Sequence, residues 1–106
     1  MPVYNPPIIP STYGHDITGM TQGIITVGIG ALQFTSNACK RVDLSSQSLN
    51  TAKIYVGSAD TIAGNGTSGG IELLPGDFYS LDIDNTDKIW VEAGAVSQKL
   101  SFIFYT

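Results

Sequence analysis

Charged side chains are scarce in this chain. Lys, Arg, Asp and Glu make up 13% of its 106 residues, about half of what a soluble domain usually carries. Five basic residues against nine acidic ones leave a net charge of −4, whereas nucleic-acid phosphates are bound by clustered Lys and Arg. The composition therefore argues against a nucleic-acid partner. A disordered chain is excluded as well, because such chains are rich in charge and poor in aromatic and β-branched residues.

Cysteine and histidine occur once each, as Cys39 and His15. A single cysteine excludes a disulfide framework and a cysteine-ligated zinc site. Nearby Lys40 and Arg41 would lower the pKa of the Cys39 thiol, but cysteine is also among the most buried residue types, and a packing role is the stronger interpretation. His15 lies in a proline-rich stretch, which is a poor place to hold a general base rigidly. We therefore expect no enzyme and no cofactor.

Long apolar runs are also missing. No uninterrupted run approaches the roughly 20 residues that span a bilayer. The sequence before Lys40 contains no basic residue, whereas a secretory signal begins with positive charge and continues into an apolar stretch. We therefore expect a soluble protein that is made in the cytoplasm and has no membrane partner. This expectation leaves an assembled particle open as its final location.

The chain has room for one small domain. Residues 1–20 differ in composition from the rest of the chain. Proline stands at Pro2, Pro6, Pro7 and Pro10. Because proline fixes φ and lacks an amide donor, the pattern predicts an extended arm. The apolar residues of this arm are Val3, Tyr4, Ile8, Ile9 and Tyr13. An apolar extended segment gains stability only by lying on a surface, either that of its own domain or that of a neighbouring subunit. We expect some part of this arm to contact a neighbouring subunit; the alternative is a disordered terminus.

Residues 21–106 form the predicted folded domain. Short runs rich in β-branched and aromatic residues alternate with turn residues, at intervals of about ten residues. The predicted strands cover residues 23–29, 31–35, 40–45, 52–57, 71–73, 78–83, 88–93 and 98–105. The fold class is therefore all-β: a single β-sandwich or jelly-roll-like barrel of about seven or eight short antiparallel strands, with an extended proline-rich N-terminal arm. The order of strand pairing stays open.

Two glycine-containing segments predict loops between these strands. Residues 64–69 (Gly-Asn-Gly-Thr-Ser-Gly) match the phosphate-binding pattern G-x-G-x-x-G. That pattern requires a helix after its third glycine, whereas here a short β run follows, so a loop over residues 58–70 is favoured. Residues 74–77 (Leu-Pro-Gly-Asp) predict a tight turn, with proline second and glycine third.

The acidic run at residues 82–87 is the only candidate for a metal site. Carboxylates at alternate positions resemble the start of a calcium loop, but the glycine and the glutamate that such a loop needs are replaced by Asp87 and Ala93. The stronger interpretation is a solvated strand end followed by a turn that caps its own amides. We therefore predict no metal, with Asp82, Asp84 and Asp87 as weak candidates.

Trp90 alternates with Ile89 and Val91 and so lies on the opposite face of its predicted strand. Either that strand is buried on both sides or Trp90 is a candidate interface residue, because tryptophan is enriched at binding hot spots. Packing within the sandwich core is the alternative.

The order of motifs in residues 40–105 resembles that of small virion proteins of tailed bacteriophages. Residues 41–44 (Arg-Val-Asp-Leu) and 53–57 (Lys-Ile-Tyr-Val-Gly) precede a Gly/Ser/Thr-rich loop. Residues 70–77 (Gly-Ile-Glu-Leu-Leu-Pro-Gly-Asp) and 81–93 (Leu-Asp-Ile-Asp-Asn-Thr-Asp-Lys-Ile-Trp-Val-Glu-Ala) follow. The resemblance is one of pattern and carries no catalytic residues.

This resemblance implies a capsid decoration (cement) protein that combines a β domain with an extended terminal arm. It implies binding between major capsid protein subunits, a homotrimer, and a location on the capsid surface after synthesis in the host cytoplasm. The alternatives are another virion part, such as a head fibre, a tail tip or a host-binding module, and a small carbohydrate- or cation-binding β domain.

Overall fold

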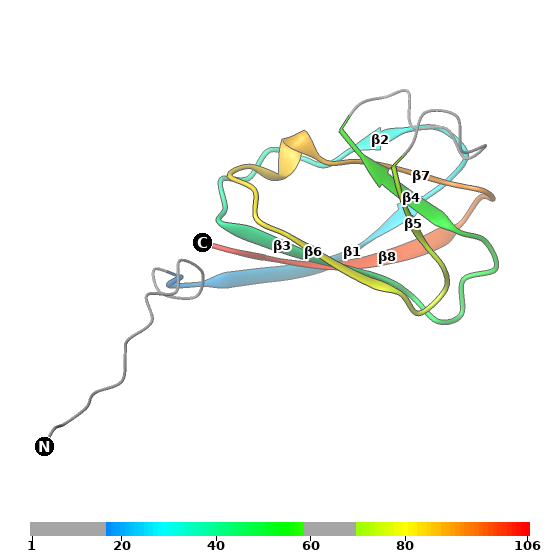
Figure 1. Cartoon of the computed structure of the whole chain (residues 1–106), viewed down its shortest axis with the longest axis horizontal. Helices are drawn as coiled ribbons and strands as arrows, with labels where there is room; N and C mark the ends of the chain where they lie inside the picture. Colours follow the sequence, from blue (N-terminus) through cyan, green and yellow to red (C-terminus); the bar gives the residue numbers. More distant parts are fainter. Residues whose placement is uncertain (1–16, 59–69) are drawn as a thin grey trace, which may run out of the picture.

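The computed structural model describes residues 17–58 and 70–106, which form eight strands and one 3-10 turn (Figure 1). The strands are β1 (Met20–Val27), β2 (Leu32–Gln33), β3 (Arg41–Ser46), β4 (Ile54–Gly57), β5 (Ile71–Leu73), β6 (Phe78–Leu81), β7 (Trp90–Ala93) and β8 (Gln98–Tyr105). The 3-10 turn η1 (Thr86–Lys88) lies between β6 and β7. No helix of the described residues is long and apolar enough to cross a membrane.

The strands form two antiparallel sheets that face each other as two layers (Figure 1). Their strand orders are β1-β8-β3-β6 and β2-β7-β4-β5. The pairs are nested: the first strand pairs with the last, the second with the seventh, and so on inward to β4 and β5. A long hairpin that wraps into two sheets in this way is a jelly roll. The predicted all-β sandwich of seven or eight antiparallel strands is confirmed, and the structure supplies the pairing order. The predicted N-terminal arm lies almost entirely outside the described residues.

The core lies between the sheets and follows the alternation of the strands. Val42 and Leu44 of β3 and Leu100 of β8 are fully buried, and Ile54 of β4 faces them from the other sheet. Complete burial of one such aliphatic side chain contributes about 1.5–3 kcal/mol. These inward residues alternate with more exposed ones along β3 and β8.

Aromatic rings complete the core beneath β1. Phe102 meets Phe34 edge to face, with ring centroids 5.5 Å apart, and stacks on Phe104 at 6.2 Å. Gly23 lies directly over Phe102: a Cβ added to this glycine would stand 2.7 Å from Phe102 Cζ. The absence of a side chain at Gly23 is therefore what lets the ring lie under the strand.

The predicted turn at residues 74–77 is confirmed. The amide of Asp77 donates to the carbonyl of Leu74 at 2.8 Å, and the carboxylate of Asp77 accepts from the amide of Leu74 at 2.9 Å. Gly76 has a φ of 93°, a left-handed conformation that glycine adopts without a Cβ penalty.

The first strand begins earlier than the predicted start at residue 23. Strand β1 begins at Met20, and the amides of Thr18 and Gly19 already donate to the carbonyl of Thr106. Backbone pairing extends the strand through these residues, although Met20, Thr21 and Gln22 are all exposed and show no alternation. The side-chain pattern therefore did not reveal this end of the strand.

Candidate functional site

The outer face of the sheet β1-β8-β3-β6 has the features of a binding surface. The pairing register aligns its outward side chains in rows that cross all four strands. One row contains Gln22, Ile103, Asp43 and Ser80, and the next contains Ile24, Ser101, Ser45 and Phe78. Ile24 and Phe78, at the two ends of the second row, are 60% and 62% exposed.

A shallow hollow of about 520 Å³ occupies this face. Its lining includes the small Ser45 and Ser101 in the middle of the sheet and the larger Ile24, Phe78 and Ile103 around them. The hollow exists because the row places two serines between two large apolar side chains. An exposed apolar patch that is bordered by polar residues is typical of interaction surfaces. We call the surface formed by these two rows of residues, with the hollow, the outer face.

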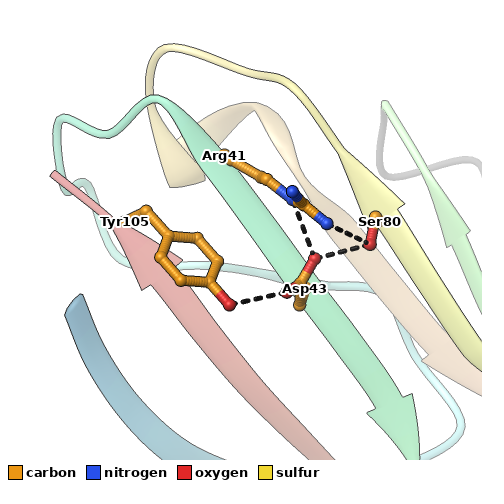
Figure 2. A network of polar contacts seen from close by, with 4 residues as sticks. All are labelled: Arg41, Asp43, Ser80 and Tyr105. Atoms are coloured by element: carbon orange, nitrogen blue, oxygen red, sulfur yellow. Dashed lines mark hydrogen bonds and ion pairs between the residues drawn. The ribbon is translucent and has the colours of Figure 1, made fainter. Parts of the chain in front are cut away.

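A polar network borders the hollow and joins three strands (Figure 2). Asp43 of β3 accepts hydrogen bonds from Ser80 Oγ of β6 at 2.5 Å and from Tyr105 Oη of β8 at 2.7 Å. Arg41 donates from Nε to Asp43 Oδ1 at 3.2 Å and from a terminal nitrogen to Ser80 Oγ at 3.3 Å. The guanidinium of Arg41 also lies over the ring of Tyr105, 5.7 Å from its centroid.

The network fixes the protonation states of two of its members. Burial disfavours the charged form of Asp43, but the hydrogen bonds from Ser80 and Tyr105 and the charge of Arg41 outweigh it and lower the pKa of the carboxyl. The hydrogen bond to Asp43, with burial, raises the pKa of Tyr105. Asp43 is thus a carboxylate whose two oxygens already accept hydrogen bonds, and Tyr105 keeps its proton. This arrangement orients side chains and makes a poor proton-transfer pair.

The acidic run contributes a capped turn. Asn85 Oδ1 accepts from the amide of Asp87 at 3.0 Å, from the amide of Asn37 at 3.1 Å and from Ser36 Oγ at 3.2 Å. Thr86 is fully buried and donates its hydroxyl to the carbonyl of Thr35. The hydrogen bond from the amide of Asp87 is the local cap that the turn interpretation predicts. The bonds to residues 35–37, which were not predicted, anchor the segment between β2 and β3.

Two carboxylates of this run, those of Asp82 and Asp84, are exposed, while Asp87 is half-buried. Leu81 and Ile83 pack against the core, so Asp82 and Asp84 lie on the exposed side. Asp84 forms an ion pair of 2.7 Å with Lys88, which lowers the pKa of Asp84. Within residues 17–58 and 70–106, no three His, Cys, Asp or Glu side chains are close enough together to hold a metal ion.

The suggestion that cations lower the pKa of Cys39 is wrong. The thiol is buried and donates to the carbonyl of Ile83 at 3.2 Å. Burial, with the charge of Asp84 as a second cause, raises its pKa. The packing interpretation of Cys39 is the one that the structure supports.

Trp90 lies on the outside of the other sheet, where β7 pairs with β2 and β4. Its neighbours across the two ladders are Gln33 and Gly57. Ile89 and Val91 are buried, while Trp90 is half-buried. Trp90 is therefore far from the outer face described above, and an interface role for it stays a prediction.

Several predicted residues lie outside the described part of the chain. They are the arm residues Val3, Tyr4, Ile8, Ile9 and Tyr13, His15, and the glycine-rich residues 64–69.

Sequence reasoning missed the outer face and its network. The signals were present: Asp43 is a rare charged residue at an outward strand position, and Tyr105 alternates with the buried Phe104. Their proximity depends on β8 pairing with β3, which the pattern of either strand alone does not disclose.

Comparison of the chain with known proteins identifies no family. No protein-family model matches the chain, and a search of curated proteins found no match. The functional inference therefore rests on the residues of this chain.

Proposed function

We propose that the protein is a non-enzymatic virion component that decorates and stabilises a phage capsid by binding between major capsid protein subunits. The observation that carries the proposal is the exposed apolar surface of the sheet β1-β8-β3-β6. Met20, Ile24 and Phe78 are each at least 60% exposed. A decoration protein needs contact area more than chemistry, and each Å² of apolar area removed from water contributes roughly 25 cal/mol.

Two further features support this role. The jelly roll recurs in viral capsid and lectin domains, an analogy of fold that supports a function without establishing one. The motif order of residues 40–105 resembles that of small phage virion proteins. The apolar sequence of residues 1–13 would add a second contact with the shell, and joining two contacts in one chain strengthens attachment.

The decisive experiment is co-sedimentation of the protein with undecorated capsids of the phage that encodes it. The wild-type protein should bind and should raise the temperature at which the shell releases its DNA. Replacing both Ile24 and Phe78 by Ser should weaken binding by about tenfold or more, since every 1.4 kcal/mol of lost binding free energy is tenfold. Leu49→Ser is the matched control, because Leu49 is 91% exposed and lies outside the outer face.

Deletion of residues 1–16 tests the arm separately in the same assay. Weaker binding with an unchanged fold would support the arm as a second contact, and unchanged binding would remove it from the mechanism. No co-sedimentation of the wild-type protein, or equal binding of the double variant, would contradict capsid decoration.

A host-binding module is the second candidate, because Phe78 beside the polar Ser45 and Asp43 also suits a glycan. Competition with phage adsorption to host cells, combined with an unchanged shell rupture temperature, would favour that candidate.

A further inference from the structure

Among the described residues, the two sheets have four edge strands, and one of these strands differs from the rest. Strands β2, β5 and β6 have two, three and four residues, and short edges resist pairing with other chains. Strand β1 has eight residues, Met-Thr-Gln-Gly-Ile-Ile-Thr-Val, with no proline and no charge. It therefore lacks the sequence devices by which natural sheets keep an edge unpaired.

The backbone groups along this edge can be assigned from the pairing of β1 with β8. Gly19 and Thr106 exchange both of their hydrogen bonds, at 3.3 and 2.9 Å. In an antiparallel ladder such pairs alternate along the strand. The amides and carbonyls of Met20, Gln22, Ile24 and Thr26 therefore point away from β8. No strand of the described residues lies on that side of β1.

We propose that β1 of a second copy pairs antiparallel along this edge, about a two-fold axis at Gly23. In that register Gln22 lies opposite Ile24 of the second copy, and Met20 lies opposite Thr26. Each of these pairs exchanges both of its hydrogen bonds, so every outward backbone group of Met20, Gln22, Ile24 and Thr26 gains a partner.

A second copy fits this edge better than a charged partner does. The chain has a net charge of −4, yet no charged residue lies in β1, so identical edges meet there without direct repulsion. The axis passes between two glycines, where no side chains oppose each other. The exposed side chains of Met20 and Ile24, 63% and 60% accessible in one copy, become partly covered.

Pairing also changes the candidate site. The two sheets β1-β8-β3-β6 merge into one, and their outer faces lie on the same side. Ile24, which lines the hollow of its own copy, then borders Gln22 in the hollow of the other. The assembly presents one continuous surface with two hollows, whether its target is a capsid or another partner. The proposal does not depend on capsid decoration.

The test is the solution mass of the full chain, measured by sedimentation equilibrium over a range of concentrations. We expect a reversible dimer with twice the chain mass. Ile24→Pro removes an amide that faces the open edge and spares the hydrogen bonds to β8. Sheets tolerate proline at such a position of an edge strand. Ile24→Lys adds an edge charge and leaves the backbone unchanged. Each variant should weaken dimerisation at least about tenfold, with thermal unfolding monitored to confirm the fold.

The control is Leu49→Lys, which makes the same change of charge at an exposed apolar residue away from the edge, and it should keep the wild-type mass. Hydrogen exchange adds a second measurement: the amides of Gln22 and Ile24 should be protected in the wild-type protein at high concentration and should lose that protection on dilution. A wild-type monomer at all concentrations, a trimer, or an undiminished dimer in both Ile24 variants would overturn the proposal. A failure here leaves the co-sedimentation result, and so the proposed function, unaffected.

Discussion

At the residue scale, Asp43 connects β3 to both of its neighbours, because Ser80 donates to it from β6 and Tyr105 from β8. Replacing Asp43 by Asn puts an amide group where a second acceptor oxygen is needed and removes the charge that faces Arg41. Hydrogen bonds to a charged group contribute about 1.5–3 kcal/mol, so we expect unfolding free energy to fall by about 1–3 kcal/mol in urea denaturation. Asp82→Asn, at an exposed carboxylate outside the network, should leave stability unchanged; equal losses in both variants would contradict this role.

The same network predicts how stability depends on pH. The pKa of Asp43 is lower in the folded protein than its ordinary value, so the unfolded chain binds the proton more tightly. The stabilising contribution is therefore complete above the ordinary pKa of Asp, about 3.9, and is lost as pH falls through the folded pKa. Urea denaturation from pH 6 down to acid should show a steeper loss for the wild-type protein than for Asp43→Asn. Parallel pH profiles would exclude Asp43 as a source of the acid sensitivity.

Gly23 is expected to tolerate no side chain. An alanine there would bring its Cβ to 2.7 Å from Phe102 Cζ, and the aromatic cluster would have to move. Overpacking of this kind costs about 1–3 kcal/mol, measurable as a lower urea midpoint. Gly28→Ala provides the control. Apart from the residues adjacent in sequence, the atom nearest to a Cβ added at Gly28 is Val96 Cα, at 3.9 Å. A smaller effect at Gly23 than at Gly28 would contradict the packing argument.

At the scale of elements, Asn85 joins the turn η1 to the segment between β2 and β3. Its side chain accepts hydrogen bonds from the amides of Asp87 and Asn37 and from the hydroxyl of Ser36. Asn85→Ala should cost about 0.5–2 kcal/mol, the range for loss of a cap, and should speed hydrogen exchange in residues 34–38. Asp84→Ala removes only the exposed ion pair with Lys88 and should leave both unchanged. Slow exchange in residues 34–38 of Asn85→Ala would show that another contact holds this segment.

The strands themselves were predictable, because alternation and turn residues are local signals. All eight strands of the described residues overlap their predicted ranges. The end of β1 was missed because pairing to β8, and not side-chain burial, holds Thr18 to Gln22 in the sheet. Pairing order joins strands as far apart in sequence as β1 and β8, so no single segment encodes it.

The candidate site was less predictable for the same reason. Ile24, Ser45, Phe78 and Ser101 come from four separate strands, and only the register places them in one row. Each residue alone is an unremarkable outward strand position. The acidic turn, in contrast, was predictable as a turn because the hydrogen bond from the amide of Asp87 to Asn85 is local. Its hydrogen bonds with the distant Ser36 and Asn37 were not predictable from the segment alone.

At the scale of the whole molecule, the nested pairing gives β8 a central place between β1 and β3. Deleting residues 98–106 removes a partner from both strands and the buried Leu100 and Phe104. We expect this deletion to abolish cooperative unfolding, observed by circular dichroism and by loss of dispersed NMR signals. Deleting residues 1–16 spares all eight strands and should leave the transition intact. A folded product without residues 98–106 would contradict the central role of β8.

The solution mass also decides between two assemblies. The resemblance to phage decoration proteins implies a trimer, while the open edge of β1 implies a two-fold dimer. These predictions exclude each other for the free protein, so one sedimentation experiment separates them.

The junction of Thr18 and Gly19 with Thr106 also determines how the domain responds to force. Both ends of the folded unit lie at one end of the β1–β8 ladder, with backbone hydrogen bonds perpendicular to the strands. A pull that separates residue 18 from residue 106 therefore loads these bonds one after another and unzips the ladder. A pull applied between residue 18 and residue 98 instead shears β1 along β8 and loads all the bonds together. The domain should thus peel open easily when held by its two ends and resist strongly when held across the length of the ladder.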